Sequence, residues 1–246
     1  MHHSIEIYGH IVSDPLANIY RAFGIKCTSP IDIISGLEKA AGAPVDLIIN
    51  SGGGDAFVGV EIYSRLKAYS GQLKAKVYSL AASAASIIAM GADSILISPG
   101  GQIMIHNVSI SHAAGDVNAL SKTVNLLKNF DQSLANIYIH KTGKTLAEVL
   151  ALMDKETWFT ASEAIKQGFA DGLLFYNKEV PEYKKTTEQK TSNVSTVATN
   201  QSKNAQSDQM RMRLNQLKDK QFAADATELE RAKAKLNLLK MKKVGV

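Results

Sequence analysis

The sequence is poor in several residue types whose abundance would indicate particular classes of protein. Its 246 residues include one cysteine, five prolines and one tryptophan, and no run of 18 apolar residues occurs. A single cysteine, Cys27, excludes an internal disulfide framework and favours a reducing compartment. The missing apolar run argues against a transmembrane helix, and the start MHHSIEIYGH lacks the basic and apolar regions of a signal peptide. We therefore expect a cytoplasmic protein without a membrane partner.

Metal ligands and clustered positive charge are equally scarce in most of the chain. The six histidines and one cysteine form neither an HExxH nor a CxxC pattern, so we predict no metal site and no bound cofactor. The net charge of +5 arises in residues 176–246, which contain 15 Lys and Arg against 8 Asp and Glu. Residues 1–175 contain 13 against 15, so this part lacks the basic surface typical of nucleic-acid binding.

Apolar periodicity predicts alternating strands and helices in residues 1–175. Residues 4–8 alternate like a short strand, residues 45–50 form a short apolar run, and strands are also predicted at residues 73–80, 94–97 and 102–106. Helical spacing predicts helices at residues 30–42, 56–69, 84–90, 117–140, 145–153 and 160–167. Strands that alternate with helices indicate an α/β fold with a largely parallel sheet.

The character of the chain changes after Phe175. Residues 184–208 are rich in Lys, Thr, Ser, Asn and Gln and contain no aromatic residue, which is typical of a flexible linker. Residues 209–243 contain helix formers without Gly or Pro and predict a charged helix, solvated or self-associating rather than a nucleic-acid arm. The predicted organisation is a folded domain over 1–175, a linker over 176–208 and a charged helical tail over 209–246.

A glycine run lies where a predicted strand meets a predicted helix. Residues 50–55 read Asn-Ser-Gly-Gly-Gly-Asp, and three glycines there predict a tight turn with positive φ angles. Backbone N–H groups exposed at a helix N-terminus would bind an anion, either a phosphate or an oxyanion. Neither GxGxxG nor GxxxxGK[ST] is present, so a nucleotide is not indicated.

Ser83 and His106 are the candidate reacting pair. Ser83 lies in the run AASAAS between a strand and a helix, where a serine is either an exposed nucleophile or a helix N-cap. His106 ends an apolar strand, a place where histidine is more often structural. Together they suit nucleophilic catalysis, because a hydroxyl needs a base of near-neutral pKa to accept its proton.

Four motifs, taken in order, resemble the Clp protease proteolytic-subunit family. They are Asn50–Gly54, Ala81–Ser83, Met104–His106 and the stretch from Thr160 to Asp171. The resemblance spans roughly residues 3–175 and is closest to the bacteriophage branch, the head maturation (prohead) proteases. The phage-like features are NSGGG, AASAAS and the phrase MDKETWFTA. The resemblance implies a ClpP/crotonase-like fold for residues 1–175, with a protruding long helix over 117–140.

The resemblance also implies roles for individual residues. Ser83 would be the nucleophile and His106 the general base. Gly54 and Ala84 would supply the oxyanion-hole N–H groups, and Gly53 would shape the turn. The third triad position falls on Glu156. Asp154 remains an alternative, since it would share the face of Glu156 if this stretch were extended.

The implied activity is hydrolysis of peptide bonds through an acyl-enzyme. The phage relatives act on capsid and scaffold proteins, inside the bacterial host or within a procapsid. Members of the family form homo-oligomers, usually heptamers stacked in pairs. Three alternatives stay open: a housekeeping peptidase that works with an ATP-dependent unfoldase, a crotonase-fold acyl-CoA enzyme, and an assembly protein.

Overall fold

The computed structural model describes residues 3–111 and 113–175. The predicted linker and charged tail lie outside these residues. No helix in the described part of the chain is long and apolar enough to cross a membrane.

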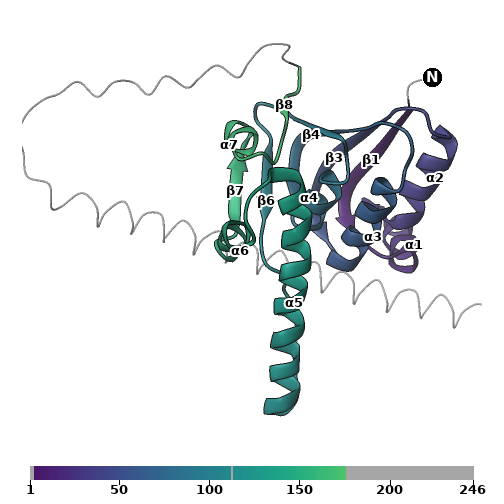
Figure 1. The fold of residues 1–246 in the computed structure, drawn as a ribbon. Coiled ribbons are helices and arrows are strands. Elements are labelled where there is room, and N and C mark those ends of the chain that lie inside the picture. Colours follow the sequence, from purple (N-terminus) through teal and green to yellow (C-terminus); the bar gives the residue numbers. More distant parts are fainter. Residues whose placement is uncertain (1–2, 112, 176–246) are drawn as a thin grey trace, which may run out of the picture. The chain divides into compact units, whose positions relative to one another are not determined.

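A single eight-stranded sheet organises the described chain (Figure 1). Its main path runs β2-β1-β3-β4-β5-β8, and all of these neighbours are parallel. The strands are β1 (His3–Ile11), β2 (Cys27–Thr28), β3 (Val45–Gly54), β4 (Leu73–Ala82), β5 (Ser94–Ile97), β6 (Gln102–Ile105), β7 (Thr157–Thr160) and β8 (Gly172–Leu173). This architecture confirms the predicted α/β fold with a largely parallel sheet.

The sheet forks at β4. The first half of β4 pairs with β5, from Lys74 to Val77, whereas its last residues, Leu80 to Ala82, pair with β6. β6 in turn pairs with β7, in the only antiparallel ladder among the described strands. The fork places the end of β4 beside the end of β6. Ser83 directly follows the first of these strands, and His106 directly follows the second.

Helices pack on the faces of the sheet, and side-chain caps begin several of them. They are α1 (Asp14–Ala22), α2 (Pro30–Ala40), α3 (Ala56–Lys67), α4 (Ala84–Ala89), α5 (Val117–Thr142), α6 (Leu146–Asp154) and α7 (Ala161–Lys166). α6 and α7 each begin with a Thr/Glu capping box, which satisfies backbone N–H groups at the first turn. The N-cap threonines donate backbone hydrogen bonds to Glu148 and Glu163, and these bonds lower the pKa values of the two glutamates.

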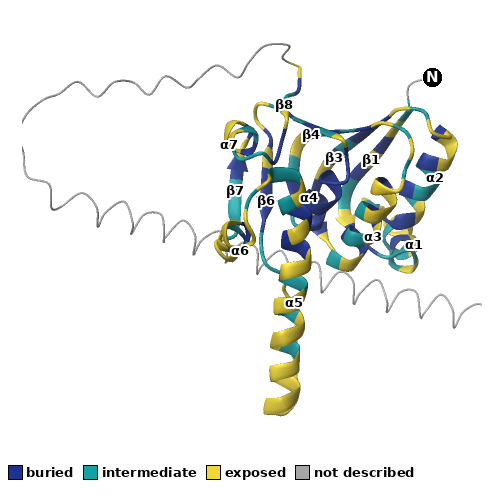
Figure 2. Cartoon of the chain, in the orientation of Figure 1, coloured by how far each residue is buried: buried dark blue, intermediate teal, exposed yellow. Residues whose placement is uncertain are grey.

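The sheet interior forms the core (Figure 2). Leu47 and Ile49 of β3 and Val77 of β4 are fully buried. β3 reads as an apolar run and is buried over most of its first five residues, as in a strand covered on both faces, whereas β1, β4 and β5 alternate between buried and more exposed positions.

α5 has two different halves. Its inner half packs against the domain through the buried Leu134 and Tyr138, whereas its outer half projects away from the sheet (Figures 1 and 2). Val117 is 78% exposed and Leu126 is 61% exposed. The predicted protruding helix is therefore present, and it ends at Thr142 rather than at His140.

Several predicted boundaries differ from the structure. β3 continues to Gly54, so residues 52–54 form the end of a strand rather than a tight turn. α1, β2, β7 and β8 were not predicted, because they are short or lack a clear period. Residues 154–156 are not extended, since Asp154 ends α6, Lys155 is its C-cap and Glu156 has a φ of 47°.

Candidate active site

Ser83 occupies a strained junction between β4 and α4. Its φ of 54° and ψ of −126° are seldom adopted by residues other than glycine. Two backbone hydrogen bonds hold this conformation: Ser83 N–H donates to Met104 O at 3.0 Å, and Ser83 O accepts from Ser86 N–H at 2.9 Å. A strand-to-helix turn of this kind presents a serine hydroxyl outward, as in a nucleophile elbow.

A buried chain of hydroxyl groups supports the same junction. Ser86 Oγ donates to Ser83 O at 2.7 Å and lies 2.8 Å from the Tyr138 hydroxyl. Because Ser86 has already used its only proton, Tyr138 is the donor in the second bond. Burial raises the pKa of Tyr138 far above its ordinary value, so its proton is retained. Through this chain, the inner half of α5 fixes the backbone of Ser83.

His106 lies directly after β6 and faces Ser83. Its Nε2 is 2.7 Å from Ser83 Oγ, and both side chains are half-buried. The Ala82–Met104 strand pairing brings the two residues together across 23 positions of sequence. A hydroxyl in hydrogen-bond contact with an imidazole is the arrangement that nucleophilic catalysis requires.

Two glycines at the end of β3 lie against this pair. A Cβ on Gly53 would be 2.7 Å from Ser83 Cβ and 3.0 Å from Ala84 N, and a Cβ on Gly54 would be 2.2 Å from Ile11 O. Asp55 N–H donates to Ile11 O on β1. The glycine run is thus the end of strand β3 rather than the predicted turn.

The two candidate acids bind residues beside the base, since Asn107 follows His106 and Trp158 pairs with Met104 on β6. Asp154 Oδ1 accepts from Asn107 Nδ2 at 2.7 Å, and Glu156 Oε1 accepts from Trp158 Nε1 at 3.3 Å. The two acids therefore do not share one face of an extended segment, because the end of a helix separates their backbones. Which of them completes a triad stays a prediction.

Asp131 is a further acid near the base, and sequence reasoning missed it. It lies on α5, and its Oδ1 accepts from Val108 N–H at 2.7 Å, two residues after His106. Burial raises its pKa, the Val108 bond and His106 lower it, and Asp154 raises it. No motif marks Asp131, since only the packing of α5 brings it to this place.

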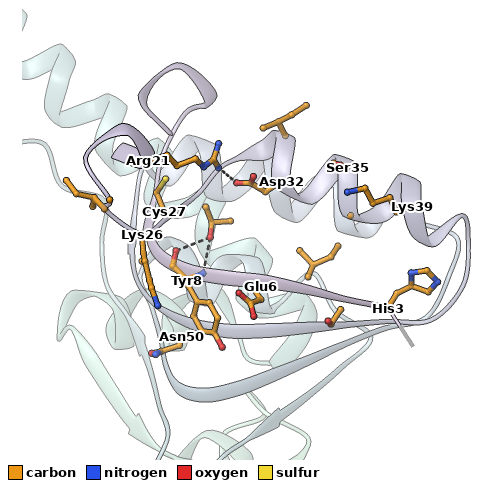
Figure 3. Close-up of a pocket in the computed structure, with 18 residues that line it drawn as sticks. His3, Glu6, Tyr8, Arg21, Lys26, Cys27, Asp32, Ser35, Lys39 and Asn50 are labelled. Atoms are coloured by element: carbon orange, nitrogen blue, oxygen red, sulfur yellow. Dashed lines mark hydrogen bonds and ion pairs between the residues drawn. The ribbon is translucent and has the colours of Figure 1, made fainter. Parts of the chain in front are cut away.

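A cavity of about 1410 Å³ lies elsewhere, between β1, β2 and α2 (Figure 3). Glu6, Tyr8 and Lys26 line it, and the Arg21–Asp32 ion pair lies at its side. Ser83 and His106 are not among its lining residues. The chemistry of the Ser83–His106 pair, rather than cavity size, identifies the candidate active site.

Comparison with known proteins agrees with this geometry. The sequence model of the Clp protease family matches residues 26–177, more than half of the chain. The chain belongs to the Clp protease family. Its reaction class follows: it is a peptidase of the serine type, which agrees with the Ser83–His106 hydrogen bond.

Relatives in this family include proteolytic subunits of ATP-dependent Clp proteases from several bacteria. Subunit 1 of Chlamydia trachomatis (serovar D) is 29% identical over 137 residues, covering 54% of this chain and 71% of the relative. Subunit 1 of Protochlamydia amoebophila is 31% identical over 145 residues, covering 56% and 69%. Subunit 2 of Tropheryma whipplei is 27% identical over 129 residues, covering 52% and 71%.

Proposed function

We propose that the chain is a serine endopeptidase that cleaves peptide bonds through an acyl-enzyme at Ser83. Ser83 Oγ attacks the scissile carbonyl carbon while His106 Nε2 accepts its proton. His106 then donates that proton to the leaving amine, and water releases the acyl group by the reverse sequence. The observation that carries this proposal is the 2.7 Å contact between Ser83 Oγ and His106 Nε2.

The oxyanion of the tetrahedral intermediate would be bound by the N–H groups of Gly54 and Ala84. Ala84 follows Ser83 at the start of α4, and the Gly53 backbone packs beside it. Losing one such donor costs about 2.7–4 kcal/mol of transition-state stabilisation. For the third triad position we favour Glu156 over Asp154, since Glu156 takes the family position.

An active-site serine probe tests the reaction class. A fluorophosphonate should label the wild-type protein at Ser83, and Ser83→Ala and His106→Ala should abolish labelling together with peptide hydrolysis. Ser64→Ala, an exposed serine on α3, should label as wild type. Absence of label on folded wild-type protein would overturn the proposal, and would favour the acyl-CoA or assembly alternatives.

The finer proposal is a phage head maturation protease that acts on capsid or scaffold proteins in the host cytoplasm or a procapsid. The variants NSGGG, AASAAS and MDKETWFTA support it, as do the predicted linker over 176–208 and the charged tail over 209–246. We further propose that the enzyme cleaves its own linker. Mass spectrometry should then find truncation in the wild type and an intact chain in Ser83→Ala, whereas equal truncation would exclude self-processing.

A housekeeping role is the second candidate, and the names of the relatives support it. They are proteolytic subunits of ATP-dependent proteases, which would imply an unfoldase partner for this chain. Degradation of a folded substrate that requires both ATP and a Clp-type unfoldase would favour this role. Efficient cleavage of a capsid or scaffold protein without ATP would favour the phage role.

We also propose that the chain acts as a homo-oligomer of stacked rings. The exposed apolar residues on the outer half of α5, among them Val117, Val124 and Leu126, support a contact there. Native mass spectrometry would give the subunit number, and a monomer at working concentration would contradict this proposal.

A further inference from the structure

The two residues that follow His106 are each held by a carboxylate from a different helix. Asp154, the last residue of α6, accepts from the Asn107 side chain, and Asp131 of α5 accepts from Val108 N–H, both at 2.7 Å. His106 lies just outside the sheet, because β6 ends at the residue before it, Ile105. The anchoring of residues 107 and 108 therefore helps to fix the backbone from which the imidazole extends.

The hydrogen bond from Val108 N–H does not by itself explain why position 131 is an aspartate. The amide oxygen of an asparagine could accept the same hydrogen bond without the desolvation that a charge suffers. Asp131 is half-buried, and its burial and the like charge of Asp154 both raise its pKa. The favourable effects are the Val108 N–H and the nearby His106, so the negative charge is best matched when His106 is an imidazolium.

We propose that Asp131 is a positioning residue for His106, which anchors the chain after the base and stabilises its protonated form with a negative charge. The role rests on the proposed Ser83–His106 mechanism. His106 becomes an imidazolium when it takes the proton of Ser83, so a negative charge held two residues along the chain, on Val108 N–H, lowers the energy of that step. Asp131 acts beside the third triad carboxylate and does not replace it.

The direction of the pH effect follows from the charge. A negative charge near His106 raises the pKa of the imidazole, so removing it lowers that pKa. His106 must be neutral to act as a base. In Asp131→Asn the acidic limb of the rate profile should therefore move to lower pH, while the maximal rate falls.

The test measures the second-order rate of fluorophosphonate labelling at Ser83 over a pH series, with the full-length chain. For Asp131→Asn we expect a fall of about tenfold in the maximal rate and a downward shift of about one pH unit in the acidic limb. Asp131→Ala should be slower again, because Val108 N–H then loses its acceptor as well. Glu38→Gln, which removes an exposed negative charge on α2, is the matched control and should leave rate and limb unchanged.

A purely structural role predicts a different result. It would lower the melting temperature and the fraction of labelled protein without moving the acidic limb, and that outcome would overturn the proposal. The proposal would also be overturned if the pH profile of the labelling rate were the same in Asp131→Asn and Glu38→Gln, or if neither Asp131 variant folded. Absence of labelling in the wild type would remove the proposed peptidase mechanism itself, and is thus distinguishable from failure at Asp131 alone.

Discussion

The nucleophile side and the carboxylate side of the site are held in different ways. Ser83 and His106 extend from two paired strands, and backbone hydrogen bonds fix their separation. Asp131, Asp154 and Glu156 come instead from a long helix, a helix end and a turn residue with positive φ. Side-chain contacts set their positions. The reacting pair is consequently built into the sheet, whereas the groups that tune the base depend on how α5 and α6 pack.

The sharpest test of this contrast is the third triad position. Glu156→Gln should lower the maximal rate by up to about 10⁴-fold with little change in stability, if Glu156 orients His106 as an acid does in a serine triad. Single-turnover acylation measures this effect, and Asp154→Asn tests the competing assignment. A large loss in Asp154→Asn with near wild-type behaviour in Glu156→Gln would reverse the assignment.

On the nucleophile side, a change that displaces the backbone beside Ser83 should lower the labelling rate. In Gly53→Ala the new Cβ would lie 2.7 Å from Ser83 Cβ, at a residue with a φ of 97°, so the strand end must move away from Ser83. We expect a loss of about 10²–10³-fold in labelling rate, comparable to the loss of one oxyanion donor. Gly52→Ala is the control, because nothing lies within 4 Å of its added Cβ and its φ is not in the positive range. Equal losses in both variants would contradict this explanation.

These two sides also differ in what the sequence could predict. The order of NSGGG, AASAAS and MIH predicted Ser83 and His106 as the reacting pair, and their catalytic roles stay a prediction. The pairing of β4 with β6 brings their side chains to 2.7 Å, a contact that the order of motifs does not specify. β5 was predicted at its observed bounds, and the long helix differed by two residues. Strand formation at Gly52–Gly54 was missed, since a glycine run usually signals a turn and only pairing with β1 extends β3.

The carboxylate side could not be predicted in the same way. Asp131 lies 25 residues from His106 along the chain, with no motif around it. Its position depends on the angle at which α5 crosses the domain, which apolar spacing does not specify. Likewise, the positive φ of Glu156 arises where α6 ends and β7 begins, and no glycine marks that turn.

The hydroxyl chain joins the two sides, and breaking it should have a moderate effect. Tyr138→Phe removes the donor to Ser86, and we expect a loss of about 1 kcal/mol in unfolding free energy. Chemical denaturation measures this change, with labelling as a second readout of the Ser83 backbone. Tyr63→Phe is the control, because its hydroxyl makes no hydrogen bond to the described residues. An unchanged stability in Tyr138→Phe would show that the chain does not support the junction.

The smallest effect on folding is expected at the outer half of α5. Leu126→Ala should change the unfolding free energy by no more than about 0.5 kcal/mol, since the side chain is 61% exposed. Native mass spectrometry should nevertheless show weaker oligomers than in Lys128→Ala, an exposed neighbour on the same half. Unchanged assembly in Leu126→Ala would place the subunit contact elsewhere.

The fork in the sheet has a consequence for how the protein can lose activity. β6, which carries the base, adjoins β4 over three residue pairs, whereas the β1–β3–β4 ladders run over most of the length of their strands. Local opening of β6 and β7 would carry His106 away from Ser83 and expose the buried Ile103 and Ile105, while the β1–β3–β4 ladders stay paired. Amide hydrogens of Ile103 and Ile105 would then exchange before those of Leu47 and Ile49. The peptidase could become inactive well below the temperature at which it unfolds.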